Sequence, residues 1–236
     1  CHAMPDRLPR IVIDLEKLRH INCGLGRFSL HFAQEILRLA PGRFDPVFLL
    51  AQGTERHLPP QGFDRVDVRP WRKEVLVRRL RPFIRSFLSP SRIGLWHVTN
   101  QMSKYLPLDD RVPVVLTIHD LTFLHETPHD EQLRRIERKL ADIQMKVNRA
   151  SAIVTDSHYV AEDVKAHLAL GDRPVHIVHL GISAPSVAAA SRPTFLPEGP
   201  FLLTMGNCLP HKNFHVLLDL VDRLPNIRLV IAGKKM

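Results

Sequence analysis

Short apolar runs alternate with stretches of helical periodicity along most of this 236-residue chain, and this alternation restricts the possible folds more than any other feature. Residues 11–15 are an almost wholly apolar, β-branched run, which is typical of a strand buried on both faces of a parallel sheet. From Phe28 to Leu39, apolar residues recur at helical spacing. Further apolar runs and helical patterns follow, the runs at 47–50, 94–98, 114–118, 152–155 and 175–178, and the helical patterns at about 73–88, 131–149 and 157–168. The order predicts βαβ units in a doubly wound, Rossmann-like parallel α/β sheet.

A linker is predicted at 183–199, where the sequence is small, Pro-rich and without periodicity. It separates an N-terminal unit, 5–182, from a second unit, 200–236. In the second unit, apolar runs at 201–205 and 227–232 flank one amphipathic helix, which is a single βαβ unit. This unit is shorter than the ~40 residues that independent folding usually needs. We therefore expect a second Rossmann-like domain that is incomplete, in a chain truncated soon after that domain begins.

The sequence predicts no membrane-spanning helix and no disulfide framework. No apolar run approaches the ~20 residues that a spanning helix needs. The opening Cys1–Met4 lacks the features of a signal peptide, and we expect the natural start at Met4. Cys23 and Cys208 lie far apart, without the spacing of zinc ligands. These features favour a reducing, cytoplasmic location.

The net charge of +9 is concentrated in one stretch. Between Trp71 and Arg92, seven Lys and Arg residues accompany one acidic residue. A basic amphipathic helix at about 73–88 could dock on an anionic membrane, which would place the protein peripherally on the inner face of the cytoplasmic membrane. A solvated helix over the domain core is the alternative, and no readout motif supports a nucleic-acid partner. The membrane-facing residues would be Arg72, Lys73, Arg78, Arg79, Arg81 and Arg85.

A glycine-containing segment, Gly24-Leu25-Gly26-Arg27, lies between the first predicted strand and helix. A loop there would aim free backbone N–H groups at an anion such as a diphosphate, and Arg27 would add donors. A plain tight turn is the alternative. A nicotinamide-dependent oxidoreductase is less favoured, because Ser29 stands at the third glycine of the dinucleotide-binding motif.

Polar residues follow two of the predicted strands. His119 and Asp120 come directly after 114–118, at the edge where open α/β sheets bind ligands. The histidine could hydrogen-bond a sugar hydroxyl, and Asp120 could fix its tautomer or bind the sugar. Ordinary polar residues opening a loop are the alternative. His97 has the same kind of position, and the nearby His125 and His129 complete no zinc signature, so no metal site is predicted.

A third candidate joins a strand to the helix of the second unit, at 206–213. Lys212 would add a positive charge to the start of that helix, which suits phosphate. An N-capping Asn213 beside a solvated Lys212 is the alternative.

Taken together, the motifs resemble family 4 of the retaining GT-B glycosyltransferases, which build cell-surface polysaccharides and lipopolysaccharides. The order and spacing carry the resemblance, through segments at 24–27, 95–100, 117–120, 155–158, 179–182 and 206–213. The resemblance implies two Rossmann-like domains facing across a cleft, the first for a glycan or lipid-linked acceptor and the second for a nucleotide-diphosphate sugar. It implies no metal or other cofactor.

The resemblance also implies roles for particular residues. Catalytic roles would fall to His119 and Asp120, and acceptor-side or sugar-side roles to His97, Asn100 and Ser157. The donor diphosphate would contact Gly24, Gly26, Arg27, Gly206, Asn207, Lys212 and Asn213. Two departures matter, because Asn207 replaces a frequent arginine and the family's donor-binding glutamate pair would lie beyond Met236. We therefore expect residues 1–236 alone to be inactive; the alternative function is a non-catalytic basic module that docks on an anionic membrane or polymer.

Overall fold

The computed structural model describes residues 8–68, 93–125, 130–182, 191–206 and 212–233. The chain forms two compact units, residues 1–180 and 181–236. The basic stretch with Arg72, Lys73, Arg78, Arg79, Arg81 and Arg85, and the helix expected at 73–88, lie outside the described residues.

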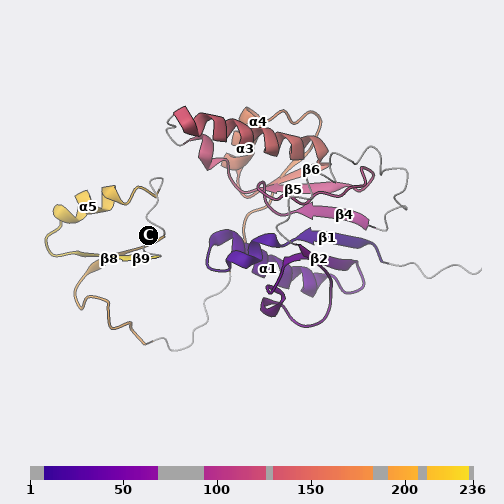
Figure 1. Ribbon diagram of the computed structural model, residues 1–236. Helices are drawn as coiled ribbons and strands as arrows, with labels where there is room; N and C mark the ends of the chain where they lie inside the picture. The colour runs from indigo at the N-terminus through magenta and orange to yellow at the C-terminus, as the bar shows by residue number, and fades with distance from the viewer. Residues whose placement is uncertain (1–7, 69–92, 126–129, 183–190, 207–211, 234–236) are drawn as a thin grey trace, which may run out of the picture. The chain divides into compact units, whose positions relative to one another are not determined.

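A seven-stranded parallel sheet forms the centre of the first unit, in the order β3-β2-β1-β4-β5-β6-β7 (Figure 1). The prediction of a doubly wound, Rossmann-like α/β sheet is confirmed. The strands are β1 (Arg10–Asp14), β2 (Asp45–Ala51), β3 (Asp64–Val68), β4 (Ile93–Val98), β5 (Val114–Ile118), β6 (Ala152–Thr155) and β7 (Val175–Ile177).

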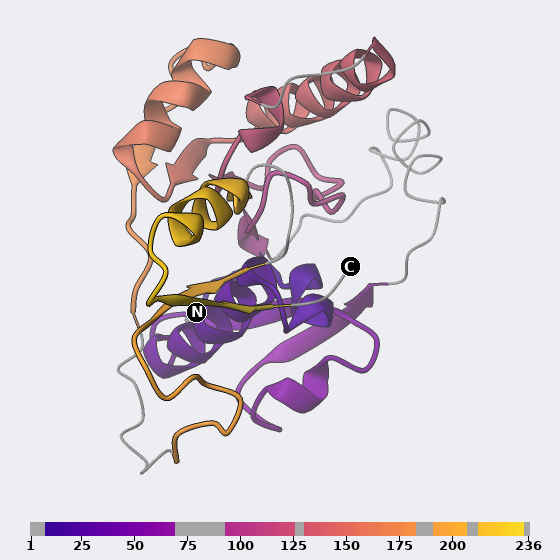
Figure 2. The same cartoon turned by 90° about the vertical axis from the view of Figure 1, so that its left-hand side faces the viewer.

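Helices cover the two halves of this sheet separately. In both Figure 1 and Figure 2, α1 (Gly24–Leu39) lies beside β1 and β2, whereas α3 (Asp130–Arg149) and α4 (His158–His167) lie along the half that contains β5 and β6. Three short 3₁₀ helices, η1 (Glu16–His20), η2 (Glu55–His57) and η4 (Thr122–Leu124), follow β1, β2 and β5.

Two apolar clusters hold these layers together. Ile13 and Phe48 are buried beneath Phe32 and Ile36 of α1, while Leu116 belongs to the cluster that includes α3 and α4. Burial of such side chains contributes about 1.5–3 kcal/mol each. The predicted apolar runs at 11–15, 47–50, 114–118 and 152–155 lie within or overlap β1, β2, β5 and β6, whereas β3 is largely exposed and was not predicted.

The strand order makes β1 and β4 neighbours, although β2 and β3 come between them in the chain. The connections after β1 and β4 therefore lead to opposite halves of the sheet, and ligands of open α/β sheets bind at such a switch point. Asp14 ends β1, and Thr99 and Asn100 follow β4 at this point.

The prediction of a loop at 24–26 is wrong, because these residues form the first turn of α1. Gly26 is required there by close packing: a Cβ on it would stand 2.0 Å from the carbonyl oxygen of His20 in η1. Gly24 has open space around its Cα and is exposed. Glycine's low helix propensity suggested a loop, and packing of α1 against η1 overrides it.

The second unit contains a single parallel βαβ arrangement, with β8 (Phe201–Met205), α5 (His215–Asp222) and β9 (Arg228–Ala232). Its elements match those expected from the sequence. The helix begins one residue later than expected, with Phe214 at the N-cap position, so Asn213 is not the cap. Asn213 instead has a φ of 47° and connects Lys212 to the helix.

Candidate functional site

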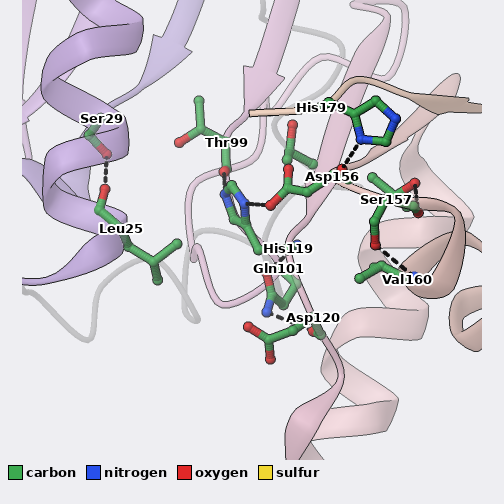
Figure 3. A network of polar contacts seen from close by, with 12 residues as sticks. Leu25, Ser29, Thr99, Gln101, His119, Asp120, Asp156, Ser157, Val160 and His179 are labelled. Carbon is green, nitrogen blue, oxygen red and sulfur yellow. Dashed lines mark hydrogen bonds and ion pairs between the residues drawn. The ribbon is translucent and has the colours of Figure 1, made fainter. Parts of the chain in front are cut away.

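His119 lies just beyond the carboxyl end of β5 and is held by both ring nitrogens (Figure 3). Its Nδ1 is 2.6 Å from Oδ2 of Asp156, which follows β6, and its Nε2 is 2.9 Å from the backbone oxygen of Thr99, which follows β4. Its side chain is 7% exposed. Three neighbouring strand ends thus fix one imidazole.

These contacts determine the chemical character of the ring. A backbone carbonyl can only accept, so Nε2 of His119 donates to Thr99. A carboxylate also only accepts, so Nδ1 donates to Asp156 when Asp156 is ionised. The two contacts therefore hold the imidazole in one orientation at the ligand-binding edge, between the Asp156 carboxylate and the Thr99 carbonyl.

The carboxylate that orients His119 is Asp156, and not Asp120 as the sequence suggested. Asp120 is exposed, and its Oδ1 accepts a hydrogen bond of 3.2 Å from the amide of Thr122 at the start of η4. Its other carboxylate oxygen can still face a ligand. The signal for Asp156 was a carboxylate following the adjacent predicted strand, in the segment Thr155-Asp156-Ser157.

Two phenylalanines of α1, one helical turn apart, cover both strand-end histidines. The Phe28 ring meets His119 edge-on at 4.7 Å between centroids, and the Phe32 ring meets His97 edge-on at 5.3 Å. The two phenyl rings stack at 5.4 Å. Because Phe28 directly follows Arg27, α1 brings the start of its first turn to the same edge as His119.

His97 lies within β4 and contacts Oγ1 of Thr117 through Nε2 at 2.8 Å. Burial, together with a smaller contribution from the nearby His119, lowers the pKa of His97 to about 4. His97 is therefore neutral near pH 7. Its contacts with Phe32 and Thr117 place it within the packed layer between β4 and α1.

Asp14 is a buried carboxyl that sequence reasoning missed. Its Oδ1 accepts from the amide of Glu16 at 2.9 Å, and its backbone oxygen accepts from the hydroxyl of Thr99. Within the described residues, its Oδ2 has no hydrogen-bond partner. Burial raises the pKa of Asp14 to about 6, while Ser103 and the Glu16 amide offset part of that rise. A charged residue inside the apolar run 11–15 was the available signal.

Asn100 and Ser157 both contact backbone groups. Asn100 is buried, its Oδ1 accepts from the amide of Met102, and its Nδ2 has no partner among the described residues. Ser157 caps α4 by accepting from the amide of Val160 at 3.2 Å. The backbone oxygen of Asp156 also contacts Nδ1 of His179 at 3.0 Å, so Asp156 contacts two histidines.

The first turn of α1 has the properties of an anion site. Its N-cap, Cys23, makes no side-chain capping bond, and Gly24 and Arg27 are exposed. In the second unit, Lys212 and Asn213 are exposed, Gly206 has a φ of 154°, and Asn207 lies outside the described residues. The structure brings Gly24, Gly26 and Arg27 to the edge that holds His119, while the second unit is described only by itself.

The described residues provide neither a metal site nor a membrane-spanning helix. They contain no group of three or more His, Cys, Asp or Glu side chains arranged to hold a metal ion. No helix within them combines the length and apolar character needed to cross a membrane.

The sequence model of Glycosyltransferase Family 4 matches residues 24–184. A comparison with curated proteins finds no match. Among solved structures, the chain is similar to a UDP-glucosyltransferase from Polygonum tinctorium capable of glucosylating indoxyl, at 14% identity and a TM-score of 0.40, over 86% of this chain and 59% of that one.

Two further solved structures are similar. The glycotransferase of kitacinnamycin shares 12% identity at a TM-score of 0.46, over 96% of this chain and 66% of that one. The spinosyn rhamnosyltransferase SpnG, complexed with thymidine diphosphate, shares 14% identity at a TM-score of 0.37, over 96% of this chain and 65% of that one. This chain thus spans 59% to 66% of the length of the three structures.

Proposed function

The chain belongs to Glycosyltransferase Family 4, and we propose that its gene product moves a sugar from a nucleotide-diphosphate sugar to a glycan or lipid-linked acceptor. The transfer proceeds with retention of configuration, in cell-surface polysaccharide or lipopolysaccharide synthesis. Residues 5–182 form the acceptor-side domain, 183–199 the linker, and 200–236 the start of a nucleotide-sugar-binding domain of GT-B type. The observation that carries the proposal is the His119 imidazole fixed between Asp156 and Thr99 at the carboxyl edge of β4, β5 and β6.

Charge compensation is the main contribution that these residues make in this proposal. As the bond between sugar and diphosphate breaks, negative charge develops on the departing nucleotide diphosphate. Fixed positive groups aimed at that charge lower the barrier, because they need no reorganisation. The guanidinium of Arg27 supplies one such group, and His119, which Asp156 holds in place, lies near the transferred sugar. Asp120, exposed beside it, binds the sugar through its remaining oxygen.

The donor diphosphate is proposed to bind at two helix starts. The uncapped first turn of α1 offers backbone N–H groups and the guanidinium of Arg27. In the second unit, Gly206, Asn207, Lys212 and Asn213 supply the other contacts. Acceptor or sugar contacts are proposed for Asn100, His97 and Ser157, whose present partners are the protein contacts described above. The proposed sugar transfer requires no metal ion.

A cytoplasmic location, peripheral on the inner face of the membrane, is also proposed. The basic stretch containing Arg72, Lys73, Arg78, Arg79, Arg81 and Arg85 would attract anionic lipids at about 1 kcal/mol for each basic residue near the surface. We expect the protein to sediment with phosphatidylglycerol vesicles, and to lose most of its affinity for them when these residues are changed to glutamine. Equal sedimentation of both proteins would contradict this location.

Transfer is tested with the complete gene product and a panel of UDP-, GDP- and dTDP-sugars, with nucleotide release as the readout. We expect His119→Gln to lower kcat by ~100-fold or more, which is typical for loss of a positioned catalytic group. The exposed His176→Gln serves as the matched control and should stay within about twofold of wild type. Retention is checked by NMR of the product's anomeric centre. Failure of every donor to release nucleotide in the presence of glycan and lipid-linked acceptors would refute the proposed function.

A further inference from the structure

The Gln101 side chain bonds the backbone on both sides of the peptide that joins His119 to Asp120. Gln101 follows β4, is 5% exposed, and reaches the end of the neighbouring strand β5 (Figure 3). Its Nε2 donates to the backbone oxygen of Asp120 at 2.9 Å, and its Oε1 accepts from the amide of His119 at 3.2 Å. One carboxamide thus satisfies a donor and an acceptor of two consecutive residues.

Gln101 is itself fixed from the opposite side by a buried lysine. Nζ of Lys146, on α3, donates to the backbone oxygen of Gln101 at 2.8 Å and contacts the carboxylate of Asp142. The Lys146 side chain is 1% exposed. Burying an ammonium group costs free energy unless it is paired and hydrogen-bonded, so this contact is maintained in the folded protein.

These bonds form one continuous path from α3 to the candidate catalytic residues. Lys146 fixes the backbone of Gln101, and the Gln101 side chain fixes the backbone of His119 and Asp120. The His119 imidazole is oriented separately, by Asp156 and Thr99. Backbone and ring are therefore held by different groups, and losing either set lets the imidazole shift.

We propose that Gln101 is a positioning residue for sugar transfer: its carboxamide fixes the backbone at 119–120, so that the His119 imidazole and the Asp120 carboxylate keep their places at the sheet edge. The role rests on the proposed function, because His119 and Asp120 act on the donor sugar only there. Displacing a catalytic group by about 1 Å can cost ~100-fold in rate.

The chain provides a matched control in Gln144, on α3. Its Nε2 donates to the backbone oxygen of Ala169 at 2.9 Å, and its Oε1 accepts from the amide of Ala169 at 2.8 Å. The pair of bonds is the same in kind, at a place away from the site. Gln144 also donates to Oδ1 of Asn148 and is less buried than Gln101, so Gln144→Met controls for the loss of a paired amide-to-backbone contact away from the site.

Two readouts are compared in the complete gene product, the ring ¹⁵N signals of His119 and steady-state nucleotide release. Gln101→Met should move the His119 signals and lower kcat ~10–100-fold, with the donor KM within about threefold. Gln144→Met should leave both near wild type. Gln101→Glu keeps an oxygen that accepts from His119 but loses the donor to Asp120, so it should also move the His119 signals and lower kcat, and it serves if Gln101→Met folds poorly.

The outcomes separate this role from the proposed function. If wild type releases nucleotide but Gln101→Met and Gln101→Glu change His119 and kcat no more than Gln144→Met does, the positioning role is overturned. If wild type transfers no sugar with any donor, the proposed function fails and the role in catalysis falls with it, whereas the ¹⁵N signals still decide whether Gln101 holds the His119 imidazole.

Discussion

Asp14 and His97 are both buried near the carboxyl edge of the sheet, and burial shifts their pKa values in opposite directions. Burial favours the neutral form of each, which raises the pKa of Asp14 to about 6 and lowers that of His97 to about 4. Both groups are therefore neutral between about pH 4 and 6 in the folded state. Their contributions to the pH dependence of stability must oppose each other there.

For Asp14, the folded pKa exceeds the unfolded value of 3.8, so the folded state binds the proton more tightly. Its favourable contribution is complete below pH 3.8 and is lost as pH rises through about 6. Asp14→Asn keeps an oxygen for the Glu16 amide. We expect it to raise the free energy of unfolding at about pH 7.5 by up to about 3 kcal/mol, and to have little effect near pH 4.

Urea denaturation across this pH range measures the effect, with the exposed Asp172→Asn as the control. A gain for Asp14→Asn that is the same at every pH would contradict the assignment.

For His97, the folded pKa lies below the unfolded value of 6.5, so the neutral form is favoured on folding. Its contribution is present above pH 6.5 and is lost as pH falls through about 4, by about 3 kcal/mol in total. We expect His97→Gln to remove this loss, so that its free energy of unfolding relative to wild type rises as the pH falls from about 6.5 to about 4. Asp14→Asn should show the reverse slope. Parallel pH profiles for the two variants, measured by urea denaturation, would rule this out.

The junction between the elements η1 and α1 depends on the absence of a side chain at Gly26. A Cβ at Gly26 would collide with the His20 carbonyl oxygen, whereas a Cβ at Gly24 meets no atom within 4 Å. We expect Gly26→Ala to destabilise the protein by about 3 kcal/mol through displacement of α1. Gly24→Ala should be neutral or stabilise by about 0.5 kcal/mol, because alanine favours the helix.

Thermal denaturation of the two variants provides the measurement. Equal effects at both positions would show that α1 does not approach η1 as described.

Most elements were predictable because apolar periodicity dominates their sequences. Residues 114–118 and 152–155 are strands with the bounds expected. β3 was missed, because Asp64–Val68 alternates charged residues with valine and is largely exposed, so no apolar run marks it. The helical first turn of α1 was not predictable from the sequence, since the contact between Gly26 and His20 depends on tertiary packing.

The candidate site was predictable to the level of strand ends, but not of partners. Position after a buried strand was sufficient to select His119. The partner of its imidazole was misassigned to the adjacent Asp120, because the contact with Asp156 depends on β5 and β6 being neighbours in the sheet. Gln101 gave no signal, since its amide bonds join backbone groups that only the folded sheet brings together.

The two units of the molecule differ in how many of their side chains they bury. Unit 1–180 contains the buried clusters beneath α1, α3 and α4, whereas β8, α5 and β9 contain no buried residue. We expect the free energy of unfolding of a chain that ends at Leu180 to lie within about 1 kcal/mol of that of residues 1–236, because buried apolar area determines most of the stability.

Guanidinium denaturation followed by tryptophan fluorescence compares the two chains. Failure of the shorter chain to unfold cooperatively would show that residues 181–236 are needed for the first unit to fold.

The contacts that build the edge around His119 join residues far apart in the chain. Thr99 bonds to Asp14 across 85 positions, and His119 meets Asp156 across 37. Such distant pairings close late during folding, since the entropy of the intervening loops must first be overcome. A nascent chain emerging from the ribosome therefore forms its helices well before β1 pairs with β4 and His119 meets Asp156, and slow-folding mutants should accumulate as helical intermediates that lack these contacts.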